Sequence, residues 1–503
     1  MGAFLRWHGI GSRCLWADEI TQVVSYLDRD LAHCVYNGAV AQTQTPLDYI
    51  LGYGLLKVFP FSETIVRVPA MIFGTLLIPL MYLLVRELAP ASVALAACLP
   101  VVFSPSLVQY SQEARPYSIY FFFLLLALRG WIKALREPSR SGLRWLFVCW
   151  SLLYFSRMMA PLVHCAALAL CTGVMLKIAS DERPRVFVPE SARKTCLWAG
   201  GAIALQLPIT AGILFLQRRY LGANDIGQAA NLRFWTLPLR ALFVHIYPQL
   251  YGFAYPAVAI LLALAATGAL LRPRRNPLLL WLLLFVLIDP IAHAYAFLVG
   301  VHTPHEEPEP RYFVYTQLLV IPVIAGGIHA LAARRRKDAP IIAGLACGLL
   351  AALFALQLPR YYRSDEKPNY RAAGRLIDEE FVEGRDLILY VPAPQNPGWV
   401  PPLHGEGIYF RKKAEQLPLE EIRGAAWQRH ALRGRIFLVI HEEPAARGKV
   451  AAGLVQDHFN GITVVRNARP LPFLEALQRT QDELRSRYGR DPLRSQMTPS
   501  GRS

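Results

Sequence analysis

The chain has 503 residues, of which 54% are hydrophobic and only 18% are charged. A soluble protein would carry about a quarter charged residues and would not need long apolar runs, so the composition excludes an ordinary soluble protein and indicates a polytopic membrane protein. The formal net charge is +17, but the arginines stand mainly in short loops between apolar runs, which fits orientation in a membrane and argues against a nucleic-acid partner.

The chain opens with a polar segment and then an acidic pair. Residues 1–13 are too short and too polar to cross a membrane, so we predict no spanning helix before Asp18 and Glu19. This pair precedes an apolar stretch, where it would serve either as a helix N-cap or as a source of a catalytic carboxylate. For the nearby Cys14 and Cys34, two free thiols are favoured over a disulfide.

Ten apolar runs predict the membrane spans. Residues 20–45 are mixed in character, and 46–60 are apolar but too short to cross, which predicts an interfacial helix. The rule of roughly 20 apolar residues per crossing then gives the spans. They are 65–86, 91–109, 117–135, 143–156, 160–178, 197–216, 254–271, 278–299, 313–332 and 340–358.

The basic loops predict the orientation. Four loops rich in Lys and Arg, within 129–144, 177–194, 272–275 and 334–337, fall on one side if all ten spans hold. The positive-inside rule makes that side cytoplasmic. The acidic pair, the 109–117 turn, the loops 217–253 and 300–312, and everything after residue 359 then lie on the opposite, outer side. The 217–253 loop itself suits an interfacial helix.

Several charged residues stand at outer ends of spans. Glu113 and Arg115 lie two residues apart in the 109–117 turn, where a charged pair is costly unless it is paired or functional. The alternative is a surface salt bridge. Arg67 and Arg311 also stand at outer span ends, and Tyr312 follows Arg311. Each of these residues has either a functional role or the ordinary role of an anchor whose side chain snorkels to the membrane interface. His302, His305 and Glu306 resemble metal ligands, but they stand in a Pro-rich loop, and we assign no metal there.

The composition changes after Pro359. Helices are predicted over 368–381, 448–459 and 471–488, and strands over 386–391, 435–440 and 461–465. Alternating helices and strands indicate a small α/β domain with a partly parallel sheet. The predicted organisation is a transmembrane domain over 1–359 (first outer loop 12–62), an extracytoplasmic α/β domain over 360–488 and a disordered tail over 489–503.

The motifs resemble one family. Leu15-Trp16-Ala17-Asp18-Glu19 and Tyr110-Ser111-Gln112-Glu113-Ala114-Arg115-Pro116-Tyr117 are similar to the first- and second-loop motifs of bacterial membrane glycosyltransferases of family 39, the protein O-mannosyltransferase-like type with the GT-C fold. Thr45-Pro46-Leu47-Asp48-Tyr49, the block Glu63 to Gly74, Arg311-Tyr312 and Pro368-Asn369-Tyr370 resemble further family blocks. The chain departs from the pattern in lacking the first spanning helix and in having Gln44-Thr45-Pro46 where His-Pro-Pro is common.

The resemblance implies an inverting transfer of a sugar from a polyprenyl-phosphate donor to a protein, lipid or glycan acceptor, at the outer side of the cytoplasmic (inner) membrane. One carboxylate would take the acceptor proton, while the phosphate leaving group needs positive charge but no acid. We assign the base to Asp18 with Glu19 in support, and the donor phosphate to Arg115, Arg311 and Arg67. The supporting residues are Glu113, Tyr117 and Tyr312. No cofactor is assigned, although Glu113 could bind a divalent cation.

Two rival functions remain open from the sequence. A transporter or flippase of lipid-linked sugars would carry ionisable residues at mid-membrane and an internal repeat. We found no repeat and almost no charge within the spans. A non-catalytic envelope scaffold would leave the clustering of Asp18, Glu113, Arg115 and Arg311 unexplained.

Overall fold

The structure is a computed structural model of the whole chain. It describes all residues except 42–45, 158–159, 179–186, 222–247, 272–275, 299–312, 335–336, 364–368, 384, 392–415, 419–432, 442–453, 460–461, 473–474, 477, 481 and 484–503. The chain forms two compact units. One unit comprises 1–10 and 25–364, and the other comprises 11–24 and 365–503.

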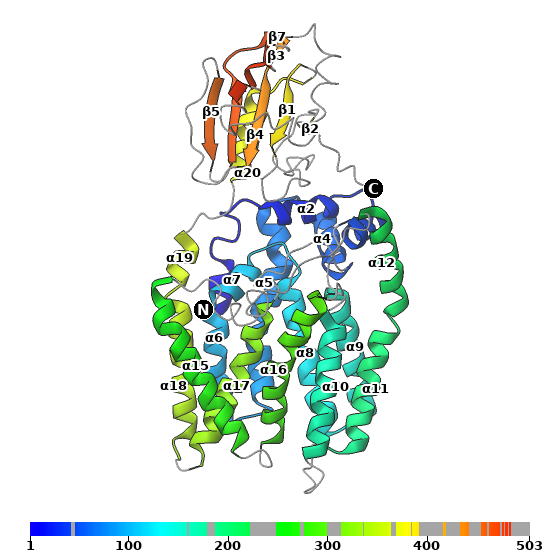
Figure 1. Cartoon of the computed structure of the whole chain (residues 1–503), viewed down its shortest axis with the longest axis vertical. Helices are drawn as coiled ribbons and strands as arrows, with labels where there is room; N and C mark the ends of the chain where they lie inside the picture. The colour runs from blue at the N-terminus through cyan, green and yellow to red at the C-terminus, as the bar shows by residue number, and fades with distance from the viewer. Residues whose placement is uncertain are drawn as a thin grey trace, which may run out of the picture. The chain divides into compact units, whose positions relative to one another are not determined.

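The first unit is a bundle of long helices, drawn from blue to yellow-green in Figure 1. Helices cover most of each predicted span in the described residues, but the run 91–109 is interrupted at residue 104 and the run 197–216 at residues 205–206. The long helices are α5 (Glu63–Val85), α6 (Ala91–Phe103), α8 (Tyr117–Arg136), α9 (Arg140–Ser156), α10 (Ala160–Ile178), α11 (Pro189–Ala204), α12 (Leu207–Leu221), α15 (Pro248–Leu270), α16 (Pro277–Leu298), α17 (Tyr315–Ala332) and α18 (Ala339–Ala355). Among the described residues, seven helices are long and apolar enough to cross a membrane, or eight if a bent pair counts as one.

Short helices precede and join the long ones. These are α1 (Gly2–Trp7), α2 (Ala17–Tyr26), α3 (Leu31–Tyr36), the π-helical turn η1 (Asn37–Ala41), α4 (Pro46–Val58), α7 (Pro105–Ser111) and α19 (Leu358–Arg363). The helix predicted over 46–60 is therefore present as α4. Asp30 caps α3 by accepting a hydrogen bond from the His33 backbone N–H at 2.8 Å.

The span predicted over 91–109 is broken. α6 and α7 meet at a bend of 66°. Pro105 has no backbone N–H to continue the helix, and the Ser104 hydroxyl accepts from the Leu107 N–H at 3.3 Å, which starts a new helix. The bend brings the polar 112–116 turn, which follows α7, to the beginning of α8.

Two helices form the centre of the bundle. In α8 and in α17, 78% of the span window is buried, a larger share than in the other spans. α17 also makes a close crossing with α15, where a Cβ added at Gly327 would lie 2.6 Å from the Ala265 Cα. Small residues at this crossing let the two backbones approach, as is common between helices in membranes.

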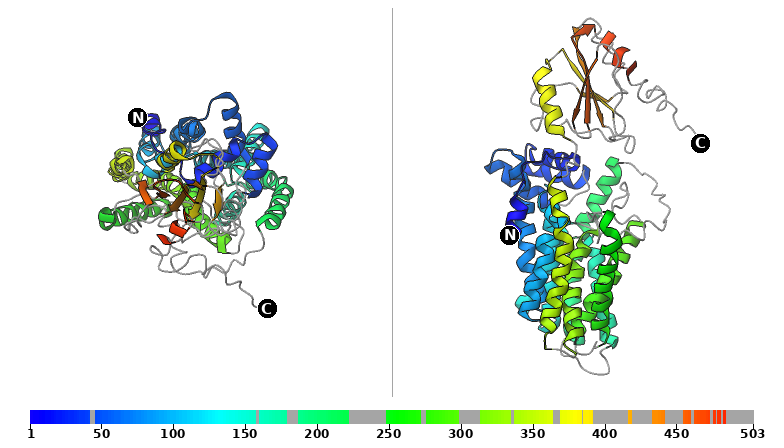
Figure 2. Two further views of the ribbon diagram at one scale, coloured as in Figure 1. Left: turned by 90° about the horizontal axis from the view of Figure 1, so that it is seen from above. Right: turned by 90° about the vertical axis from the view of Figure 1, so that its left-hand side faces the viewer.

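The second unit contains a five-stranded sheet in the order β2-β1-β4-β6-β5. The strands are β1 (Leu387–Val391), β2 (Gln416–Pro418), β4 (Ile436–His441), β5 (Leu454–Phe459) and β6 (Ile462–Asn467); β3 (Arg433–Gly434) and β7 (Leu471–Pro472) form a separate pair. β2, β1 and β4 are parallel, whereas β4, β6 and β5 are antiparallel. The predicted partly parallel sheet is confirmed. The right-hand view of Figure 2 shows α20 (Tyr370–Glu380) beside this sheet.

Two helix predictions in this unit are wrong at the residues described. The segment predicted as a helix over 448–459 forms strand β5 from Leu454, because Val455, Asp457 and Phe459 pair with β6 and tertiary pairing overrides a weak local preference. The helix predicted from Leu471 begins later, since Leu471 and Pro472 pair with β3. The predicted tail over 489–503 lies outside the described residues.

Candidate functional site

The 112–116 turn is anchored by hydrogen bonds and buries two charged residues. The Gln112 amide Nε2 donates to the carbonyl oxygens of Leu5, Arg6 and His8, at 3.1, 3.0 and 2.7 Å. Glu113 is only 2% exposed and Arg115 8%. The Gln109 amide donates to Glu113 Oε1 at 2.9 Å. The predicted exposed salt bridge is therefore excluded as a description of this turn, because both side chains are buried.

A second buried carboxylate belongs to the same site. Asp48, in the first turn of α4, is 4% exposed and accepts a hydrogen bond from the Tyr26 hydroxyl. Burial raises the pKa of Asp48 to about 6, while the Tyr26 hydrogen bond and the positive charge of Arg115 act to lower it. Arg115 therefore lies within electrostatic range of Asp48, and the two carry opposite charges near neutral pH.

Arg67 and Tyr117 border this region of the first unit. Arg67 is 1% exposed, and its Nη1 donates to the Ile10 carbonyl at 2.6 Å, so its guanidinium holds the N-terminal segment. Tyr117 begins α8, and its ring lies 4.6 Å from that of Tyr110. The Arg157 guanidinium lies over the Tyr117 ring at 5.6 Å.

The acidic pair belongs to the second unit. Glu19 is fully buried, and its Oε2 accepts from the Trp16 backbone N–H at 3.3 Å, so it makes the helix-start contact of a capping box. Asp18 is half-buried in the first turn of α2. Burial raises the pKa of Tyr370, and the nearby Cys14 and Asp18 contribute to that shift, which places Tyr370 near the acidic pair within this unit. None of the eight cysteines forms a disulfide, in agreement with the prediction for Cys14 and Cys34.

Some predicted site residues lie outside the described residues. These are Arg311 and Tyr312, as well as His302, His305 and Glu306. The segment predicted as an interfacial helix within 217–253 also falls largely there. Their roles remain predictions.

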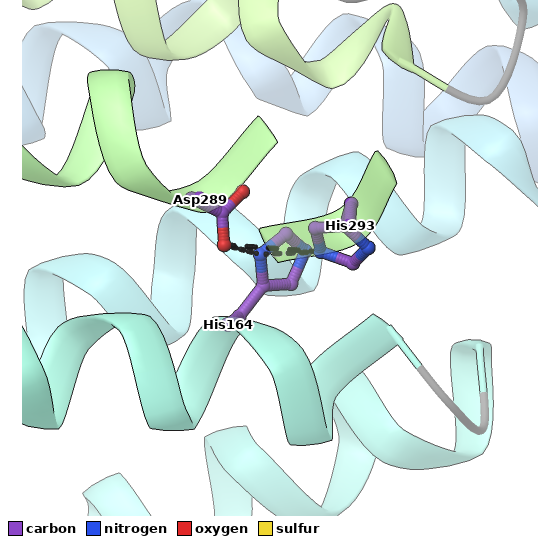
Figure 3. Close-up of side chains that lie close together, drawn as sticks. All are labelled: His164, Asp289 and His293. Atoms are coloured by element: carbon purple, nitrogen blue, oxygen red, sulfur yellow. Dashed lines mark hydrogen bonds and ion pairs between the residues drawn. The ribbon is translucent and has the colours of Figure 1, made fainter. Parts of the chain in front are cut away.

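Sequence reasoning missed two groups. Asp48 and Tyr26 were not assigned, although Asp48 stands in one of the quoted family blocks, and an acidic residue inside an apolar amphipathic segment was the available signal. The second group is His164, Asp289 and His293, which Figure 3 shows converging from α10 and α16. All three are buried, so the interpretation that the spans carry almost no ionisable residues is wrong at this point.

A family model matches the part of the chain that holds most of these buried charges. Residues 44–212 match the family model described as dolichyl-phosphate-mannose-protein mannosyltransferase. No curated protein matches the chain. This range contains Asp48, Arg67, Glu113 and Arg115, so the resemblance inferred from the motifs is confirmed over it. The match covers about a third of the chain, and over that range the chain is similar to this family of glycosyltransferases.

Solved structures add the fold. The chain resembles ArnT from Cupriavidus metallidurans in the apo state, with 12% identity and a TM-score of 0.51 over 92% of this chain and 96% of that one. ArnT from the same organism bound to undecaprenyl phosphate has 12% identity and a TM-score of 0.49, over 93% of this chain and 96% of that one. The Archaeoglobus fulgidus oligosaccharyltransferase complex with Zn and sulfate has 13% identity and a TM-score of 0.45, over 83% of this chain and 61% of that one. The apo ArnT likeness gives the fold alone, which is the predicted GT-C fold.

Proposed function

We propose that the chain is an inverting glycosyltransferase of the cytoplasmic (inner) membrane. It transfers a sugar from a polyprenyl-phosphate donor to an acceptor hydroxyl on a protein, lipid or glycan at the outer face. The observation that carries this proposal is the family match over 44–212, a family described by a lipid-phosphate-linked sugar donor, together with the buried charges that fall inside that range.

The positive charge for the donor phosphate comes first from Arg115. A phosphate leaving group is a stable anion and requires no general acid, but it does require compensation of its charge. Arg115 is buried, where an electrostatic contact is stronger than in water. The ionised Asp48 nearby favours the charged guanidinium and limits the positions that it can take. Arg311 is a second proposed phosphate ligand, while Arg67 supports the site by fixing the N-terminal segment.

The base is Asp18 in this proposal. A single carboxylate that takes the acceptor proton, without an acid for the leaving group, gives one displacement and inversion at the anomeric carbon. Glu19 makes the helix-start contact with Trp16 and supports the orientation of its neighbour. Glu113, Tyr117 and Tyr312 shape the phosphate side of the site.

The test is a transfer assay with the full chain in proteoliposomes and radiolabelled polyprenyl-phosphate sugars. Asp18→Asn should reduce transfer at least about 100-fold, within the usual contribution of a general base, while binding of the labelled donor stays at the wild-type level. Asp30→Ser is the matched control, because serine retains the cap of α3. Normal transfer by Asp18→Asn would reject the assignment of the base.

A flippase of lipid-linked sugars is the second candidate, and one observation favours it. Ionisable residues inside spans often mark transport pathways, and His164, Asp289 and His293 are such residues. A fluorescent polyprenyl-phosphate sugar in the same proteoliposomes separates the two functions. A transferase gives product without accelerated flipping, whereas a flippase moves the donor across the bilayer without forming product.

A further inference from the structure

Three potential metal ligands converge inside the helical bundle. His164 lies in the second turn of α10, and Asp289 and His293 lie one turn apart near the end of α16. We propose that His164, Asp289 and His293 bind a divalent first-row transition-metal ion, with zinc as the expected occupant, and that this ion joins α10 to α16.

The helices place these side chains together. Residues four apart lie on one face of a helix, so Asp289 and His293 face the same neighbour. That neighbour is α10, which packs against α16 and supplies His164. Two ligands from one helix turn and a third from an adjacent helix form a rigid set, because all three backbones are held by the bundle. Figure 3 shows the three side chains directed toward a common point.

The distances fit one ion. His164 Nδ1 lies 2.7 Å from Asp289 Oδ1 and 3.2 Å from His293 Nε2, and His293 Nε2 lies 3.8 Å from Asp289 Oδ1. Ligand atoms about 2.0–2.1 Å from a tetrahedral zinc ion lie about 3.3 Å apart. The three separations bracket that value. Three protein ligands also leave a fourth position open.

Hydrogen bonds can also hold the cluster when it is empty. The Tyr120 hydroxyl can donate to His164 Nε2, and the His164 Nδ1–H can donate to Asp289 Oδ1, with the Nε2 lone pair of a neutral His293 as a second acceptor. Metal binding would replace the Nδ1 proton, because all three ligand atoms would then direct lone pairs at the ion. The proposal therefore rests on the convergence and the spacing of the three ligand atoms.

The surroundings supply the support that a metal ligand needs. Metal-bound histidines donate their other ring N–H to an oxygen acceptor, and the Tyr120 hydroxyl lies 2.5 Å from His164 Nε2. Tyr120 is thus a positioning residue that would hold the ring with Nδ1 toward the ion. Asp289 is fully buried and also interacts with the Tyr315 hydroxyl. A metal ion would compensate the charge of this buried carboxylate.

The ligand types define the class of ion. Two imidazole nitrogens and one carboxylate oxygen suit zinc and its first-row neighbours, whereas magnesium and calcium prefer oxygen ligands. The ligands come from α10 and α16 and not from the acidic pair, so the proposal does not depend on the catalytic assignment.

Metal analysis of the full chain, purified in detergent without chelators, tests the proposal. We expect about one zinc ion, or another first-row transition metal, per chain in the wild type, and a loss of metal in His293→Gln. Tyr120→Phe should weaken affinity about 10–100-fold, as loss of an outer-shell partner does. His329→Ala is the matched control, because His329 is a half-buried histidine of α17 outside the cluster, and it should retain the metal.

Cobalt substitution of the wild type provides a readout that does not depend on the folding of any variant. Tetrahedral cobalt should give visible absorption bands, and a strong chelator should remove them and lower the thermal unfolding midpoint. A wild-type chain that binds less than a tenth of an equivalent after zinc supplementation, or metal that stays bound in folded His293→Gln, would overturn the proposal.

Discussion

Replacing Asp48 by asparagine should stabilise the protein and weaken its activity at the same time. Asparagine keeps the size of the side chain and an oxygen that can accept from the Tyr26 hydroxyl, but it removes the charge. Burial raises the pKa of Asp48 from 3.8 to about 6, so the folded chain holds this carboxylate ionised near neutral pH at an energetic cost. Such a cost at a buried site is typical of functional groups.

The magnitude follows from the two pKa values. Between pH 3.8 and about 6 the unfolded chain releases the Asp48 proton while the folded chain keeps it, so stability falls across this window as pH rises and stays low above it. With about 1.4 kcal/mol per pKa unit, the penalty is about 1 kcal/mol at pH 4.5 and about 3 kcal/mol at pH 7.5. Asp48→Asn removes about 2 kcal/mol of pH-dependent destabilisation between those conditions.

Thermal unfolding midpoints in detergent at the two pH values, with transfer activity measured in parallel, provide the assay. Asp48→Asn should raise the thermal unfolding midpoint more at pH 7.5 than at pH 4.5. It should also transfer sugar at least about tenfold more slowly than the wild type, since Arg115 loses its charged neighbour. Asp338→Asn is the control, because Asp338 is exposed and its side chain caps nothing. An equal shift of the midpoint at both pH values would refute the reasoning.

Three further predictions concern other contacts. Tyr26→Phe removes a hydrogen bond that favours ionised Asp48, so the acidic limb of the pH–activity profile should move to higher pH. An unchanged limb would show that the ionisation of Asp48 does not control activity. Gly327→Ala forces the crossing of α15 and α17 apart and should lower the free energy of unfolding by about 1–3 kcal/mol, measured as a lower thermal unfolding midpoint. Gly348→Ala is the control and should leave the midpoint unchanged, because a Cβ there meets nothing within 4 Å. The hydrogen bond with Arg466 lowers the pKa of Glu380, so the contribution of this carboxylate to folding stability is present above pH 4.5 and is lost as the pH falls below that value. In denaturation curves, Glu380→Gln should abolish this loss of stability at acidic pH.

The sequence predicted most of the spans because apolar length identifies them. Ten spans were predicted, and among the described residues seven helices, or eight with the bent pair, are long and apolar enough to cross a membrane. The run 143–156 lies in α9, which has only 17 residues, and the run 197–216 is divided between α11 and α12. Residues 91–109 read as one span, but Ser104 and Pro105 bend the chain there. Residues 454–459 mix apolar and polar residues in a pattern that suits either the end of a helix or a strand, and only pairing with β6 decides between the two structures.

The candidate site was predicted only where a motif was local. Glu113 and Arg115 stand two residues apart, so the sequence showed them together. Asp48 meets the hydroxyl of Tyr26 across 22 residues, and His164 meets Asp289 across 125. Such partners are determined by helix packing, which one sequence does not reveal. A lone histidine in an apolar run is also typical of an ordinary core residue, so its pattern gave little signal.

The anomeric configuration of the transferred sugar tests the central claim most directly. A polyprenyl-phosphate sugar labelled with carbon-13 at the anomeric carbon would be incubated with the full chain in proteoliposomes, and the product would be read by NMR. The account predicts a product of inverted configuration that depends on Asp18. A product of retained configuration, or the same product from Asp18→Asn at the wild-type rate, would contradict it.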